Sequence, residues 1–173
     1  MNSISRLLVV LGLVVGLAAC QTVKHFGSVE ARSSLTPDKC YVGGTYQPPI
    51  FPVSYTAYLY LQSADAGIVA LTLPAKAGLF LAELPAGHYR VDHLSFQTVD
   101  WKWVNLGVPE LSGVPFEAIP AQVTNVGSMT VESTYMVLVT TYRMRYSANP
   151  AFGERLRQEY DVPASVSIVD VTK

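Results

Sequence analysis

The stretch GLFLAELPAGHYRVDHLSF, from Gly78 to Phe96, gives the clearest structural signal in the chain. Two segments with the composition of β-strands flank Leu84-Pro85-Ala86-Gly87. Proline at the second position and glycine at the fourth suit a type I turn, because proline presets the backbone angle that this turn needs. We therefore predict that the two strands form a β-hairpin and that Gly87 takes a positive φ in its turn.

The spacing of Phe80, Leu84, Pro85, Gly87 and Tyr89 resembles the carboxypeptidase-regulatory-like and transthyretin-like β-sandwich modules. In those modules an aromatic strand precedes a Pro-X-Gly turn, and a tyrosine opens the next strand. The whole chain resembles a small bacterial outer-membrane lipoprotein of unknown function that contains such a module. The resemblance covers roughly 20 residues well and roughly 90 loosely, and it implies a β-sandwich but no function, because such sandwiches host unrelated roles.

The β pattern continues on both sides of this stretch. In residues 53–62 every second side chain is apolar, which is the period of a half-buried strand. Further strands are predicted at residues 68–73, 116–120, 121–132, 135–146 and 165–171. The passages from Phe80 to Ala86 and from Phe116 to Ala121 echo each other, so we interpret both as similar hairpins.

One helix is predicted over residues 150–160. Asn149 suits the N-cap and Pro150 the first helical position. Phe152, Leu156 and Tyr160 recur at every fourth residue and form one apolar stripe, which is typical of a helix packed on a sheet. The predicted fold is all-β: a single immunoglobulin-like or transthyretin-like β-sandwich of about seven to nine strands with one short C-terminal helix.

The N-terminal residues have the features of a signal peptide. Arg6 supplies positive charge, and the 13 residues from Leu7 to Ala19 are uncharged. As a helix this run reaches about 20 Å, which is short for a bilayer core of about 30 Å. The alternatives are an uncleaved anchor and plain secretion.

Leu17-Ala18-Ala19-Cys20 resembles the lipobox of bacterial lipoproteins. The resemblance implies cleavage between Ala19 and Cys20 and transfer of a diacylglyceryl group to the Cys20 sulfur. Mature lipoproteins of this kind are anchored by several acyl chains (palmitate among them), because one chain alone binds a membrane only marginally. Gln21 stands where aspartate usually retains such proteins in the inner membrane, so we expect the outer membrane if the host is a diderm bacterium.

These signals divide the chain into three parts. Residues 1–19 are a lipoprotein signal peptide, residues 20–36 are the lipidated cysteine with a polar, flexible tether, and residues 37–173 are one β-sandwich domain. With 12 basic and 13 acidic residues, the chain lacks the basic charge of a nucleic-acid-binding protein. Once Cys20 is lipidated, Cys40 has no partner in the chain; it is either a reactive thiol or, as we favour, a small buried apolar residue.

Motifs of catalysis are scarce. Asp92, His93 and Ser95 are close in sequence, but in a regular strand Asp92 points away from the other two. His88 and His93 likewise point to opposite faces unless a bulge intervenes. We therefore predict no catalytic residues, no metal site and no cofactor.

The candidate binding surface is aromatic. Trp101 and Trp103 share one face if their segment is extended, and Tyr58 and Tyr60 lie on the more polar face of their strand. Such side chains can stack on sugars or anchor a protein partner, although packing in the core is the more frequent role of aromatic residues. Three functions follow as hypotheses: a non-catalytic binding or structural envelope protein, an accessory subunit of a secretion or pilus assembly, and, least favoured, a hydrolase of envelope polymers.

Overall fold

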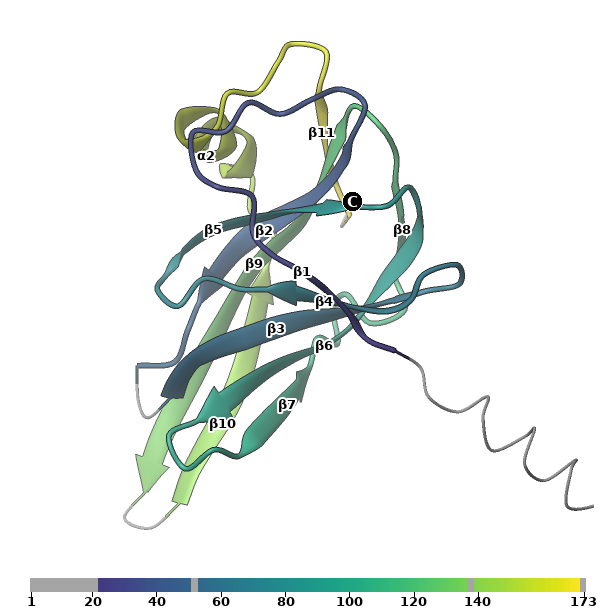
Figure 1. Cartoon of the computed structure of the whole chain (residues 1–173). Helices are drawn as coiled ribbons and strands as arrows, with labels where there is room; N and C mark the ends of the chain where they lie inside the picture. The colour runs from purple at the N-terminus through teal and green to yellow at the C-terminus, as the bar shows by residue number, and fades with distance from the viewer. Residues whose placement is uncertain (1–21, 51–52, 137–138, 172–173) are drawn as a thin grey trace, which may run out of the picture.

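The computed structural model describes residues 22–50, 53–136 and 139–171. In this part of the chain, eleven strands form two open sheets that pack face to face, with one short helix near the C-terminus (Figure 1). The predicted count of seven to nine strands is wrong. The uncounted strands lie where the alternation of apolar residues is weak: β1 has three residues, β2 is buried on both faces, and β7 follows a turn.

Sheet A has six strands in the order β1-β4-β3-β6-β7, and β8 pairs with the first part of β6. Its strands are β1 (Lys24–Phe26), β3 (Val53–Ser63), β4 (Gly67–Thr72), β6 (Gly87–Thr98), β7 (Trp103–Gly107) and β8 (Pro115–Ala118). All neighbours are antiparallel except β1 and β4, which are parallel.

Sheet B has five strands in the order β10-β9-β2-β5, and β11 pairs with the first part of β9. Its strands are β2 (Cys40–Gln47), β5 (Gly78–Leu84), β9 (Gln122–Met136), β10 (Val139–Ser147) and β11 (Ser167–Asp170). The strands β2 and β5 are buried on both faces, because the second sheet covers one face and the helix covers the other.

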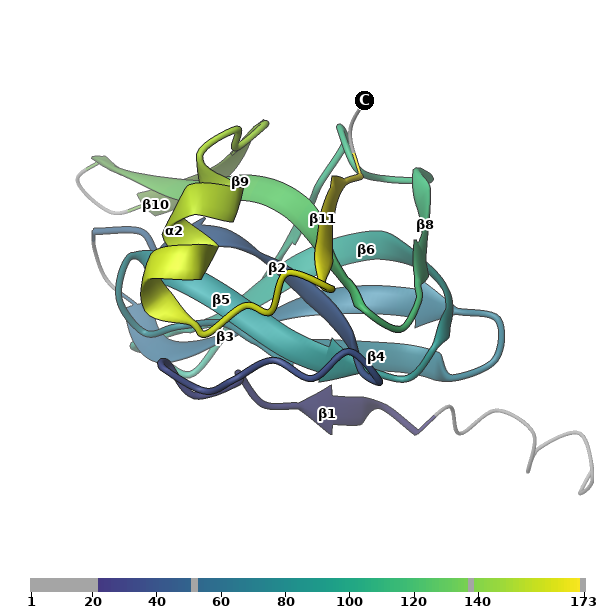
Figure 2. The same cartoon turned by 90° about the horizontal axis from the view of Figure 1, so that it is seen from above.

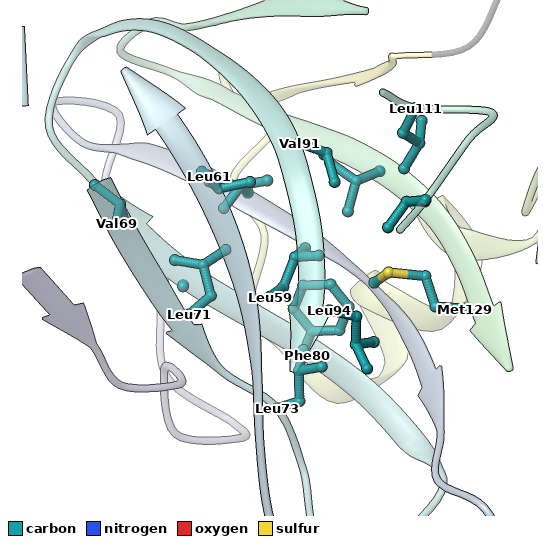
Figure 3. Close-up of a cluster of buried hydrophobic side chains, with 14 of the residues drawn as sticks. Leu59, Leu61, Val69, Leu71, Leu73, Phe80, Val91, Leu94, Leu111 and Met129 are labelled. Carbon is teal, nitrogen blue, oxygen red and sulfur yellow. The ribbon is translucent and has the colours of Figure 1, made fainter. Parts of the chain in front are cut away.

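The main core fills the space between the two sheets (Figure 3). Leu59 and Leu61 of β3 face Phe80 of β5 and Met129 of β9 across this space, and all four side chains are almost fully buried. Ala57 is buried on the same side of β3, so the alternation predicted for residues 53–62 is confirmed for the described side chains.

The helix α2 (Phe152–Glu159) packs on the outer face of sheet B (Figure 2). Its predicted stripe is confirmed: Phe152, Leu156 and Tyr160 are buried against β5 and the chain that leads into β2. The predicted N-cap is wrong by two residues, since the cap is Ala151. The Asn149 side chain instead donates a hydrogen bond to Thr45 Oγ1 at 3.2 Å, which ties the helix entry to β2.

The segment Leu84-Pro85-Ala86-Gly87 does not close a hairpin. It connects β5 in sheet B to β6 in sheet A, so the prediction of a hairpin is wrong. The buried Tyr89 explains why the motif exists: its hydroxyl donates a hydrogen bond of 2.9 Å to the Pro85 carbonyl and fixes the corner between the sheets. Gly87 has φ +154°, which side-chain-bearing residues rarely adopt.

The second passage, from Phe116 to Ala121, also crosses between the sheets, from β8 to β9. The two passages are therefore alike, as predicted, but as crossovers and not as hairpins. Tyr89, which follows the first passage, stacks on Phe116, which begins the second, with 5.8 Å between ring centroids. Two short chain reversals of one kind thus close the same end of the sandwich.

The polar segment before β2 packs on the domain, unlike a flexible tether. Lys24–Phe26 forms β1 against β4, the Val29 amide donates a 2.7 Å hydrogen bond to the Leu81 carbonyl, and Leu35 is 1% exposed. The segment covers the open edge of β5, whose unpaired backbone groups need hydrogen-bond partners. A segment that supplies such partners does not need a periodic pattern of apolar residues, so the sequence pattern did not predict this packing.

Candidate functional site

The outer face of sheet A bears a row of aromatic rings, which we call the aromatic face. It consists of His25, Tyr58, Tyr60, His93 and Trp103, contributed by β1, β3, β6 and β7. The inward residues of the same strands fill the core, so the period-two geometry of the sheet places these rings on the opposite side. Three of the four predicted binding residues, Tyr58, Tyr60 and Trp103, therefore lie together on this face.

Tyr58 is at the centre of this row. Its ring stacks on Trp103 at 5.9 Å between centroids and meets His25 edge to face at 5.2 Å. Tyr60 lies 6.2 Å away along β3, also edge to face. Rings in such contact support one another's orientation, each pair contributing roughly 0.5–1.5 kcal/mol beyond burial. The row is consequently a preorganised surface, and Trp103 on the edge strand β7 is 49% exposed.

A bulge in β6 gives the row a charged neighbour. The register between β3 and β6 shifts between Tyr60 and Leu61, because Tyr60 lies opposite His93 whereas Leu61 lies opposite Val91. Asp92 is the additional residue, and His93 Nδ1 donates to its Oδ2 at 3.0 Å. The expectation that Asp92 points away from His93 is wrong for this reason, since a bulge lets two successive residues reach the same side.

The His93 ring also stacks on Tyr60, with 4.5 Å between centroids and 9° between planes. Ser95, two residues along the strand, is buried, and its hydroxyl donates to Asn105 Oδ1 on β7. The hydroxyl proton therefore goes to Asn105 instead of His93. The arrangement contains an Asp–His pair but not the serine-to-histidine hydrogen bond that would activate a nucleophile.

The two tryptophans do not share a strand face, contrary to the prediction. Trp103 begins β7, but Trp101 lies in the turn between β6 and β7 with φ +64° and is 77% exposed. Thr98 organises this turn: its hydroxyl donates to Asp100 Oδ1 at 2.5 Å, and the Lys102 amide donates to the same hydroxyl at 3.2 Å. Trp101 consequently projects from the end of the sheet.

Asp100 and Lys102 form an ion pair in this turn, with 2.7 Å between Lys102 Nζ and Asp100 Oδ2. The hydrogen bond from Lys102, followed by that from Thr98, lowers the pKa of the Asp100 carboxyl below its usual value. The turn is therefore electrically compensated around neutral pH, and its exposed chemistry is that of the Trp101 indole.

A groove of about 450 Å³ lies at the other end of sheet A, beside the turn between β3 and β4. Its walls include Gln62, Ile68, His88 and Arg90. The Arg90 guanidinium donates to Gln62 Oε1 from Nε and Nη2, at 2.9 and 2.5 Å. Sequence reasoning missed this groove, because its residues come from strands that only the fold brings together.

Cys40 is 4% exposed, as we favoured from its type, and burial raises the pKa of its thiol, with a smaller contribution from Glu83. Cys20 and Ala19, the predicted lipidation and cleavage residues, lie outside the described residues, as does the whole predicted signal peptide. Within residues 22–171, apart from the two short gaps, no group of three or more His, Cys, Asp or Glu side chains is arranged to bind a metal ion.

No helix in the described part of the chain is both long and apolar enough to span a membrane. No family model matches the chain, and neither a curated protein nor a solved structure is significantly similar to it. Function therefore has to be inferred from the surfaces that the residues themselves form.

Proposed function

We propose that this chain is a lipid-anchored envelope protein with a non-catalytic binding role. The observation that supports binding is the aromatic face together with Trp101, since Trp and Tyr dominate the contact energy of many interfaces. The anchor rests on Leu17-Ala18-Ala19-Cys20 at the end of an uncharged run. We place the protein in the outer membrane of a diderm host, and its ligand is an envelope protein or a glycan.

We also propose that the domain is related to the carboxypeptidase-regulatory-like and transthyretin-like modules. The residues that carry this resemblance, Pro85, Gly87 and Tyr89, lie at the corner between the two sheets. The hydrogen bond from the Tyr89 hydroxyl to the Pro85 carbonyl gives a physical reason for that spacing of residues. Such a corner stabilises a scaffold and says nothing about a ligand.

Lipidation is tested by labelling growing cells with a clickable palmitate analogue. Cys20→Ser is expected to abolish the label and to leave the precursor uncut, because the sulfur that accepts the lipid is missing. Cys40→Ser is the matched control, since it removes the other cysteine of the chain and is expected to keep the label. Labelled Cys20→Ser protein would contradict the proposed anchor.

The binding role is tested after the membrane has been dissolved in mild detergent. The wild-type chain is expected to sediment with larger envelope components, whereas Trp103→Ala is expected to migrate as the chain alone. Val169→Ser serves as the control, because Val169 is similarly exposed at 44% but lies on β11, in the other sheet. Equal behaviour of wild type and Trp103→Ala would refute a role for the aromatic face.

An accessory role in a larger envelope assembly is the second candidate. One observation favours it: exposed apolar side chains gather on three loop ends of the molecule. A soluble monomer rarely displays large apolar side chains in such a group unless they contact another molecule.

A further inference from the structure

Six exposed apolar side chains lie next to three chain reversals at one end of the sandwich, and we call these six residues the apolar tip surface. Ile50 precedes β3, Val99 and Trp101 lie between β6 and β7, and Tyr135, Met136 and Val139 flank the end of the β9–β10 hairpin. Their exposed fractions range from 57% for Val139 to 91% for Ile50. These six make up most of the ten large apolar residues that are exposed in the described part of the chain.

The strand registers place these loops at the same end. Val53, the first residue of β3, lies opposite Thr98, the last residue of β6, so the first two loops are adjacent. The strands β2 and β9 are parallel, and Gln47 at the end of β2 lies opposite Thr130, beyond which β9 continues to Met136. Figures 1 and 2 show the start of β3 and the end of β9 on the side of the molecule that lies away from the start of β1.

The start of β1 lies at the opposite end. β1 runs parallel to β4, with Lys24 opposite Val69, so Lys24 lies beside the turn between β3 and β4. Along β3 this turn is separated from Val53 by about ten residues, or roughly 33 Å. Only four residue steps separate Cys20 from Lys24, which span at most about 14 Å.

A lipid on Cys20 therefore holds the sandwich close to the membrane by the end that lies opposite the apolar tips. The tips project away from that membrane, and they do not resemble a surface that binds anionic lipid, because the ammonium group of Lys102 is paired with Asp100. An apolar, electrically compensated surface fits a partner that offers an apolar hollow, and Trp and Tyr are the usual anchors of such contacts.

We propose that the apolar tip surface docks into an apolar hollow of a second envelope protein, on the side away from the anchoring membrane. The inferred partner rests on the proposed lipid anchor, because the position of the anchor is what separates the tips from the bilayer. Burial of Trp101 and Met136 drives the contact, so it depends little on salt.

The test is photo-crosslinking of the full-length lipoprotein in the cells that produce it. p-Benzoylphenylalanine is introduced at Trp101 or at Met136, on two different loops, and at Ala64 as a control. Ala64 is exposed in the turn between β3 and β4, at the anchored end. The proposal expects one protein adduct of the same mass from both tip positions and none from Ala64.

A second substitution establishes that the adduct reflects docking. With the probe at Met136, Trp101→Ser is expected to reduce the adduct by at least about tenfold, the loss typical of an interface anchor. Val169→Ser, which removes an exposed apolar side chain from β11, is expected to leave it unchanged. An adduct of twice the chain's own mass, an adduct with lipid alone, an equal adduct from Ala64, or no adduct would each overturn the proposal.

Labelling of Cys20 with the palmitate analogue in the same cells separates this proposal from the proposed anchor. Loss of the tip adduct with normal labelling refutes the docking surface alone. A tip adduct in cells where Cys20 carries no label refutes the anchor and leaves a docking surface whose orientation to the membrane has to be derived again.

Discussion

Gly127 is the position where the packing of sheet B permits the least change. It lies in β9 at a bulge, where one residue of β2, Gly44, faces two residues of β9. Its φ is +82°, and a Cβ added there would lie 2.5 Å from the Tyr146 hydroxyl and 2.8 Å from the Ser147 carbonyl oxygen. Gly127→Ala therefore combines a left-handed backbone with a steric clash, one part of which involves rigid backbone.

The magnitude follows from these two contributions. Placing alanine at a left-handed φ costs about 1–2 kcal/mol, and overpacking a filled interior costs about 1–3 kcal/mol. The expected loss in free energy of unfolding is roughly 2–5 kcal/mol, which lowers the Tm of a domain of this size by about 4–20 °C. Urea unfolding followed by circular dichroism, together with a thermal scan, measures both quantities.

Gly113 provides a matched control, because its φ is also +82° while no atom lies within 4 Å of the Cβ that would be added. Gly113→Ala should lose only the backbone contribution of about 1–2 kcal/mol. The difference between the two variants isolates the clash with Tyr146 and Ser147. Equal losses would refute the close packing of β9 against β10 at this point.

Three further predictions address the corner, the thiol and the tryptophans. Tyr89→Phe is expected to lower the free energy of unfolding by about 1 kcal/mol, because the hydrogen bond to Pro85 is lost. An unchanged urea midpoint would show that this hydrogen bond does not stabilise the corner between the sheets. Cys40 is expected to react with a thiol reagent only after denaturation, since it is 4% exposed and its pKa is raised by burial; rapid labelling of the folded chain would contradict its burial. Trp101→Phe should shift the fluorescence maximum to shorter wavelength and Trp103→Phe to longer wavelength, because Trp101 is 77% exposed and Trp103 49%; shifts of the opposite sign would reverse the assigned environments.

The sequence predicted best what depends on neighbours within one element. Leu59 and Leu61 are buried and Tyr58 is on the outer face because alternate side chains of a strand point to opposite sides. Phe152 and Leu156 are buried for the corresponding reason in a helix. These predictions required no knowledge of which strands pair, so they survive errors in topology.

The predictions were wrong where one local sequence pattern is compatible with two different arrangements of the strands. Leu84-Pro85-Ala86-Gly87 reverses the chain equally well within one sheet or between two. The choice depends on β5 pairing with β2 and on β6 pairing with β3, which are long-range contacts. Tyr89 was the available signal for a corner, because a buried tyrosine hydroxyl needs an acceptor and the Pro85 carbonyl is four residues away.

In the candidate site, too, features set within one strand were predicted and features set by pairing between strands were not. Tyr58 and Tyr60 were placed together from the period of one strand, but the contact between Asp92 and His93 depends on a register shift against β3 that no stretch of β6 reveals. The apolar tip surface was not predicted at all. Ile50, Trp101 and Met136 are far apart in the sequence, and nothing in the sequence around each of them indicates more than the end of a strand.

Register also decides what these surfaces can do. Because β2 and β9 are parallel and Val53 lies opposite Thr98, the tips meet at one end, and because β1 is parallel to β4, the start of β1 lies at the other. Antiparallel pairing of β1 with β4 would have brought the start of β1 to the tips. If Cys20 carries the proposed lipid, the register of this three-residue strand decides whether the six exposed apolar side chains face the bilayer or point away from it, so the docking proposal depends most on the β1 register.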